Sequence, residues 1–175
     1  MAKFTTKMTP QELGDTLASL VWESFSDFIA DGEADALFAD LGVTEPAADQ
    51  RIVEEMLIFL MWAHTRATQL AFVSRVPSDM IREGLDAMHR GVFEDMAEHG
   101  TPRSHLPVFE QRVGARYAEY YAAADKSDAE IGFAALRHLV GPREVPPHLP
   151  LALAERAIAV AGPLRDFLED VDLIE

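Results

Sequence analysis

Cysteine is absent from this 175-residue chain. Its absence excludes disulfide bonds, thiolate nucleophiles, and the cysteine ligands of zinc fingers and iron–sulfur clusters. A chain without cysteine is also consistent with a reducing compartment. Lysine is scarce as well, because only Lys3, Lys7 and Lys126 occur and the other basic residues are arginines.

Long apolar runs are missing too. The longest run, Met56–Ala63, is far shorter than the roughly 20 residues that a membrane-spanning helix needs. The segment Met1–Thr9 lacks the apolar stretch and the cleavage site of a secretory signal. We therefore expect a cytoplasmic protein with no membrane partner.

Acidic residues dominate the charge of the chain. There are 30 Asp and Glu residues against 15 Lys and Arg residues, which gives a formal net charge of −15. Such a chain is expected to be repelled by nucleic acid and by anionic lipid, so we predict no nucleic-acid partner. The acidity has three interpretations, which are ordinary solubility, a salt-loving source and mimicry of nucleic acid.

Helix signals cover most of the chain. Thr9-Pro10-Gln11-Glu12 and Ser127-Asp128-Ala129-Glu130 are capping boxes, and Ser78 is expected to cap a third helix. No run alternates apolar and polar residues over the length of a strand. Helical periodicity predicts segments 10–30, 33–41, 46–75, 78–99, 106–124 and 127–140, and a last helix from 151 that kinks or splits at Gly162-Pro163.

These segments predict an all-α fold. We expect one domain over residues 1–175, a helical bundle of about five long helices plus a short connecting helix, with residues 1–8 and 170–175 as frayed tails. Segment 46–75 is apolar on nearly every side, which is typical of a central helix. Its wetter stripe is predicted to hold Arg51, Glu55, Trp62, Arg66 and Gln69.

Familiar catalytic and cofactor motifs are missing. The chain has no phosphate-binding glycine loop, no Gly-x-Ser-x-Gly and no His-Glu-x-x-His. A di-iron site needs two Glu-x-x-His pairs, but only Asp86-Ala-Met-His89 resembles one, beside the isolated acids Glu23, Glu54 and Glu119. We therefore predict no metal, no cofactor and no catalytic residue.

Several polar residues fall on apolar helix faces. At 100° per residue, His64, His89, His138 and Arg116 point toward the core, and Thr68 follows His64 by one turn. A buried arginine needs an acidic partner, for which Asp27, Glu54 and Asp95 are candidates and the last two are preferred. Ser24 also lies on the apolar face of the first helix. The candidate buried polar or ligand cluster is His64, Thr68, His89, Arg116, His138, Glu54 and Asp95.

Two interpretations of this cluster stay open at this point. Each polar group can satisfy its own hydrogen bonds within the core, or the groups can converge on a polar pocket or a wet interface. The first functional hypothesis is a non-catalytic protein that acts through a protein partner or through self-association as a homodimer. Self-association is suggested by segment 127–140, where Phe133, Leu136 and Val140 lie opposite Ile131 and Leu139. The alternatives are a ligand-, metal- or haem-binding bundle, an acidic nucleic-acid mimic, and an enzyme of unrecognised type.

Overall fold

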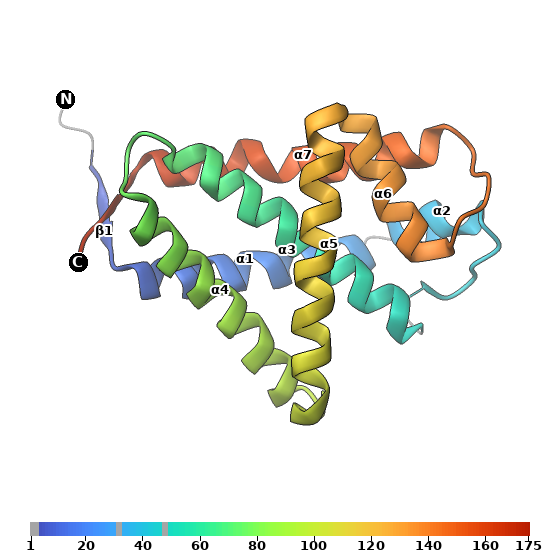
Figure 1. Cartoon of the computed structure of the whole chain (residues 1–175), viewed down its shortest axis with the longest axis horizontal. Coiled ribbons are helices and arrows are strands. Elements are labelled where there is room, and N and C mark those ends of the chain that lie inside the picture. The colour runs from blue at the N-terminus through green and yellow to red at the C-terminus, as the bar shows by residue number, and fades with distance from the viewer. Residues whose placement is uncertain (1–3, 31–32, 47–48) are drawn as a thin grey trace.

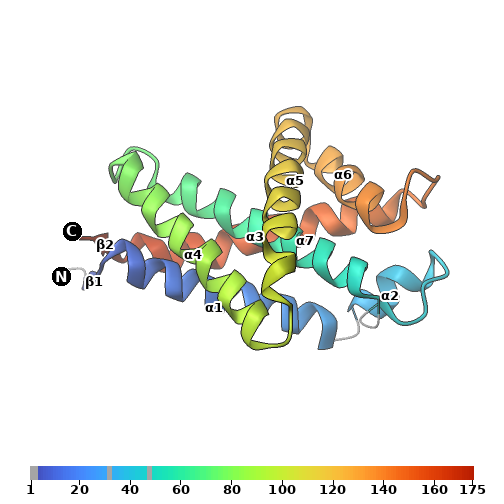
Figure 2. The same cartoon turned by 60° about the horizontal axis from the view of Figure 1, so that its bottom comes forward.

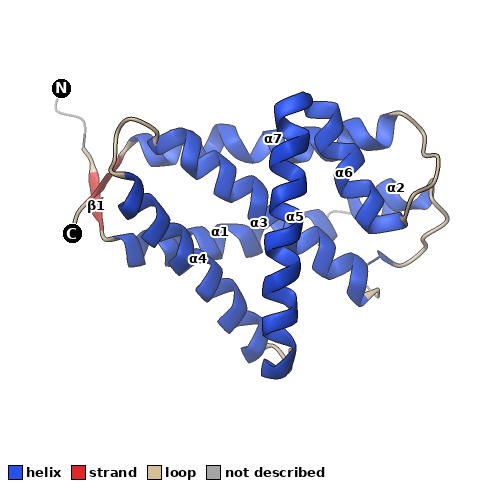
Figure 3. Cartoon of the chain, in the orientation of Figure 1, coloured by secondary structure: helices blue, strands red, loops and turns tan. Residues whose placement is uncertain are grey.

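The computed structural model describes residues 4–30, 33–46 and 49–175, which are helical over most of their length (Figure 3). Five helices have 21 to 23 residues, so the predicted all-α bundle is confirmed. They are α1 (Pro10–Ala30), α3 (Gln50–Phe72), α4 (Ser78–Glu98), α5 (Leu106–Lys126) and α7 (His148–Glu169). The shorter helices are α2 (Glu33–Ala39), α6 (Asp128–Val140) and a 3-10 turn, Arg103–His105.

Two of the three predicted helix caps are present. Thr9 Oγ1 accepts from the Glu12 amide, and Glu12 Oε2 accepts in return from the Thr9 amide. Ser127 Oγ accepts from the Glu130 amide at the start of α6. α3 begins at Gln50 rather than near Pro46, because Asp49 caps it.

Two boundary predictions are wrong. Ser78 is the first residue of α4 and makes no side-chain cap, since the preceding Pro77 occupies the cap position. α7 starts at His148 and continues through Gly162 and Pro163 to Glu169 without being split (Figure 1). The proline is tolerated because it removes only one hydrogen bond from a helix that is packed along its length.

Helix α3 passes through the middle of the molecule (Figures 1 and 2). It contacts α1, α4, α5, α6 and α7, and Met56–His64 is buried without interruption. Trp62 and Glu55 are therefore buried, and their assignment to a wetter stripe is wrong. Among the described residues, no helix is both long enough and apolar enough to cross a membrane.

Small residues allow two helix pairs to approach closely. α1 lies against α4, and a Cβ added at Gly14 would come within 2.3 Å of Ala87 Cβ (Figures 1 and 2). α6 meets α7 at Gly132, where a Cβ would come within 1.7 Å of the Pro150 carbonyl oxygen. These contacts fix the positions of α1 and α7, the two helices that frame the cavity described below.

The two ends of the described chain pair with each other. β1 (Thr6–Met8) and β2 (Val171–Leu173) form a parallel two-stranded sheet in which Thr6 faces Val171 (Figure 1). This sheet differs from the strand-free chain and from the frayed tails that we expected at 1–8 and 170–175, of which residues 1–3 lie outside the described part. Three-residue strands are too short to show an alternating pattern. Arg75 donates to the carbonyl groups of Leu168 and Val171 and so ties this end to α3.

Candidate functional site

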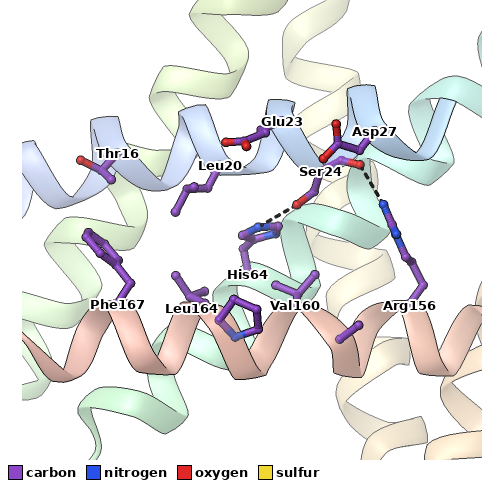
Figure 4. Close-up of a pocket in the computed structure, with 12 residues that line it drawn as sticks. Thr16, Leu20, Glu23, Ser24, Asp27, His64, Arg156, Val160, Leu164 and Phe167 are labelled. Atoms are coloured by element: carbon purple, nitrogen blue, oxygen red, sulfur yellow. Dashed lines mark hydrogen bonds between the residues drawn. The ribbon is translucent and has the colours of Figure 1, made fainter. Parts of the chain in front are cut away.

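A cavity of about 460 Å³ lies between α1 and α7, with α3 behind it (Figure 4). α1 packs mainly on α4, and α7 packs mainly on α3 and α6, so the facing sides of α1 and α7 are left to line the cavity. Leu20 of α1 faces Val160 and Leu164 of α7 across the space (Figure 4). Its apolar walls are formed by Leu20, Ala159, Val160, Pro163, Leu164 and Phe167.

His64 reaches this cavity from α3 and is only 3% exposed. Its Nδ1 lies 2.8 Å from the Leu60 carbonyl oxygen, and its Nε2 lies 3.4 Å from Ser24 Oγ. A carbonyl oxygen can only accept, so Nδ1 carries the ring proton and Nε2 accepts from the Ser24 hydroxyl. Burial lowers the pKa of His64, and this effect outweighs the opposing hydrogen bond to Leu60. The ring is therefore neutral at neutral pH, with a lone pair at Nε2.

Charged side chains from both helices surround the His64–Ser24 pair. Arg156 of α7 donates from Nη2 to the Ser24 carbonyl oxygen at 3.3 Å (Figure 4). Its guanidinium lies over the Phe28 ring. Glu23 and Asp27 of α1 line the same cavity. Arg156 also lines a second hollow of about 510 Å³, which extends toward α2.

The α7 wall also carries a backbone acceptor. Proline has no N–H, so Pro163 cannot donate the usual helical hydrogen bond to the carbonyl of Ala159. Both residues line the cavity. An apolar space edged by a few hydrogen-bonding groups is typical of sites for small molecules.

His89 lies in a separate polar chain between α4, α5 and α3. Its Nδ1 donates to the Leu85 carbonyl oxygen, and its Nε2 accepts from the Tyr117 hydroxyl at 2.8 Å. The Tyr117 oxygen is 3.4 Å from Thr65 Oγ1, whose own proton goes to the Met61 carbonyl oxygen. Burial lowers the pKa of His89 and raises the pKa of Tyr117, so both groups are uncharged.

Arg116 belongs to an ion-pair network formed by α3, α5 and α6. Its Nε and Nη2 donate to the two oxygens of Glu55 at 3.0 and 2.9 Å. The hydrogen bond and charge of Glu55 raise the pKa of Arg116 despite partial burial. The prediction that Arg116 pairs with Glu54 or Asp95 is therefore wrong. Glu54 instead binds Arg112 at 2.6 Å, and Asp95 accepts a hydrogen bond from Trp22 Nε1.

Neither His64 nor His89 hydrogen-bonds to Arg116. Instead His138 Nε2 binds Glu119, which lies 4.0 Å from Arg116. The residues of the candidate cluster therefore do not meet at one site. Arg116, Glu54 and His138 share one network, while His64, His89 and Asp95 each have other partners. Thr68 is buried, and its hydroxyl has no hydrogen-bond partner among the described residues.

No group of three or more His, Asp or Glu side chains in the described residues is arranged to hold a metal ion. The isolated acids considered for a di-iron site have other contacts, as Glu119 binds His138 and Glu54 binds Arg112. Two hydrogen-bond partners of the inward histidines, Ser24 and Tyr117, were absent from the predicted cluster. One feature of the sequence indicated that Ser24 points inward, namely its position on the apolar face of the first helix.

Comparison with protein-family models, with curated proteins and with solved structures finds no match for this chain.

Proposed function

We propose that the protein binds a small, mainly apolar molecule in the cavity between α1 and α7. The observation that carries this proposal is that neutral, buried His64 and the hydroxyl of Ser24 meet at an otherwise apolar space of about 460 Å³. This volume is within the range of roughly 300–1,000 Å³ that ligand sites occupy. A ligand there would bury its apolar part between Leu20 and Leu164 and direct a polar group to Ser24 and His64.

The charge of the site favours neutral ligands over anionic ones. Glu23 and Asp27 line the cavity, and the guanidinium of Arg156 is already engaged with the Ser24 carbonyl group and the Phe28 ring. The net charge of −15 adds to this repulsion of anions. We also propose a cytoplasmic location, which the lack of cysteine supports.

Filling the cavity should block binding. We expect the neutral dye N-phenyl-1-naphthylamine to fluoresce more strongly with the wild-type protein, and Val160→Trp to weaken its affinity by at least about tenfold. Fluorescence titration gives both dissociation constants. Leu151→Trp is the matched control, because Leu151 is exposed on α7 and does not line this cavity. Equal weakening by both variants, or no dye binding by the wild type, would refute the proposed function.

Self-association is the second candidate, on a different surface. The sequence suggested a homodimer because segment 127–140 is apolar on two sides. The structure weakens this reason, because α7 and α5 cover α6 within the chain and Leu136 is buried. Exposed apolar side chains do occur on the other side of α7. We define the apolar surface patch as Leu70 and Ile158, which are exposed and line one shallow hollow.

A homodimer through this patch is expected to give about twice the 19.4 kDa chain mass in light scattering at micromolar concentration. Ile158→Glu would place a charge in the patch and should yield the monomer mass. Val108→Glu is the control, since Val108 is exposed on α5 and lies outside the patch. A monomer mass for the wild-type protein would contradict the prediction.

A further inference from the structure

Ser24 and His64 meet in an arrangement that is used for nucleophilic catalysis. A hydroxyl nucleophile needs a base within hydrogen-bond reach and a third group that orients the base, and the first distance is often long when no substrate is bound. Ser24 Oγ lies 3.4 Å from His64 Nε2, and the Leu60 carbonyl oxygen holds His64 Nδ1 at 2.8 Å. From this geometry we propose that Ser24 and His64 form a nucleophile–base pair that hydrolyses carboxylic esters of apolar acids.

The inference rests on the proposed function, because the α1–α7 cavity must hold the substrate. The walls formed by Leu20, Val160 and Leu164 would take the apolar acyl chain. The ester carbonyl group would then lie at Ser24, the point where the apolar walls meet the hydrogen-bonding groups (Figure 4). A neutral ester fits this site better than a carboxylate, which Glu23 and Asp27 would repel.

The protonation state of His64 suits a base. The Leu60 carbonyl oxygen fixes the proton on Nδ1 and thereby leaves the lone pair on Nε2, which faces Ser24. Burial lowers the pKa of His64, so the unprotonated form is present at neutral pH.

Arg156 places a positive charge at the cavity wall while it keeps its hydrogen bond to the Ser24 carbonyl oxygen, so it would act on the reacting group through space. Its Nη2 lies 3.3 Å from that carbonyl oxygen, which holds the guanidinium beside the backbone of the residue that carries the nucleophile. A fixed cation near the reacting carbonyl group stabilises the negative charge that develops on its oxygen. This role differs from that of a backbone oxyanion hole, which the middle of a helix cannot provide because its N–H groups are already bonded.

Ser24 Oγ attacks the ester carbonyl carbon while its proton passes to His64 Nε2, and a tetrahedral oxyanion forms. The intermediate expels the alkoxide, which leaves as the alcohol with the proton from Nε2, and the acyl group stays on Ser24. Water then attacks the acyl-serine with His64 again as the base, and releases the carboxylic acid. The net reaction consumes one ester and one water and yields one acid and one alcohol.

Two assays on the intact chain test the pair. The wild-type protein is expected to hydrolyse p-nitrophenyl butyrate, with Ser24→Ala and His64→Gln each lowering the rate by about 100-fold. Ser26→Ala is the matched control, since Ser26 is exposed on α1 outside the cavity, and it should keep the wild-type rate. A phosphonofluoridate should also label the wild-type protein, and peptide mass mapping should place the label on Ser24.

The pH profile and dye binding separate this inference from the proposed function. Hydrolysis should fall as His64 becomes protonated, at a pH below the ordinary histidine value of 6.5, because burial lowers the pKa of His64. Dye binding without phosphonylation of Ser24, or hydrolysis that survives Ser24→Ala, would overturn the inference and leave ligand binding intact. Loss of both dye binding and labelling in the wild-type protein would overturn the two proposals together.

Discussion

Arg116→Met is expected to lower the free energy of unfolding by about 3 kcal/mol. The guanidinium forms two parallel hydrogen bonds with Glu55, whose side chain is 3% exposed. Methionine fills a similar volume but leaves that carboxylate without its main partner in a poorly solvated place. Arg112 Nε remains 3.5 Å from Glu55, which keeps the loss at the lower end of the range for buried pairs. Urea denaturation followed by circular dichroism measures the change.

Two further variants show whether burial is the cause. Adding Glu55→Gln to Arg116→Met removes the stranded charge and should recover part of the loss. Arg103→Met is the matched control, because Arg103 binds Glu94 with the same two-bond geometry on an exposed surface. We expect that change to leave stability nearly unaltered, since exposed pairs contribute little. Equal losses of stability from the two Arg→Met changes would show that burial does not make the Arg116–Glu55 pair more stabilising than the exposed Arg103–Glu94 pair.

The error in the partner of Arg116 has a physical origin. Glu54 and Glu55 are neighbours in sequence and so point about 100° apart on α3. When a helix is apolar on one side, its polar stripe shows which of the two faces solvent. The sequence pattern placed Glu55 on a wetter stripe, but α3 is buried on nearly every side, so Glu55 does not face solvent and the preference for Glu54 was wrong. The need of Arg116 for a carboxylate could be predicted, but its identity could not.

Local signals were sufficient for most helix boundaries. The capping boxes at Thr9 and Ser127 act through residues three positions apart, so the sequence contains the whole interaction. The β1–β2 pair joins the two ends of the chain, and nothing near Thr6 or Val171 encodes the other partner. The same limit applies to Ser24 and His64, which are 40 positions apart and meet only because α3 lies behind both α1 and α7.

The inward histidines were predicted as a class, but their hydrogen-bond partners were not. His64 and His89 both bond Nδ1 to the carbonyl oxygen one turn earlier, which the helix itself provides. Their Nε2 atoms differ, because one meets Tyr117 within the core and the other meets Ser24 at a cavity. Which partner a histidine finds depends on how neighbouring helices cross, and periodicity within one helix does not contain that information.

The close contact of α6 and α7 is the feature of the fold most sensitive to a single methyl group. Gly132 lies so near the start of α7 that a Cβ would be 1.7 Å from the carbonyl oxygen and 2.5 Å from the carbonyl carbon of Pro150. Both are backbone atoms, so no side-chain rotation relieves the overlap. α7 would have to move, and this helix forms one wall of the cavity and carries Arg156.

Gly132→Ala should therefore destabilise the protein by about 3 kcal/mol, the upper part of the usual range for overpacking. Gly114→Ala is the matched control, because Gly114 lies within α5 and a Cβ there meets nothing within 4 Å. Alanine favours a helix over glycine, so this control should instead stabilise the chain by about 0.5–1 kcal/mol. Thermal and urea unfolding should show the two Gly→Ala changes moving stability in opposite directions. A neutral Gly132→Ala would mean that α6 and α7 are not in contact at Pro150, and the α7 wall of the proposed ligand site would then need to be placed differently.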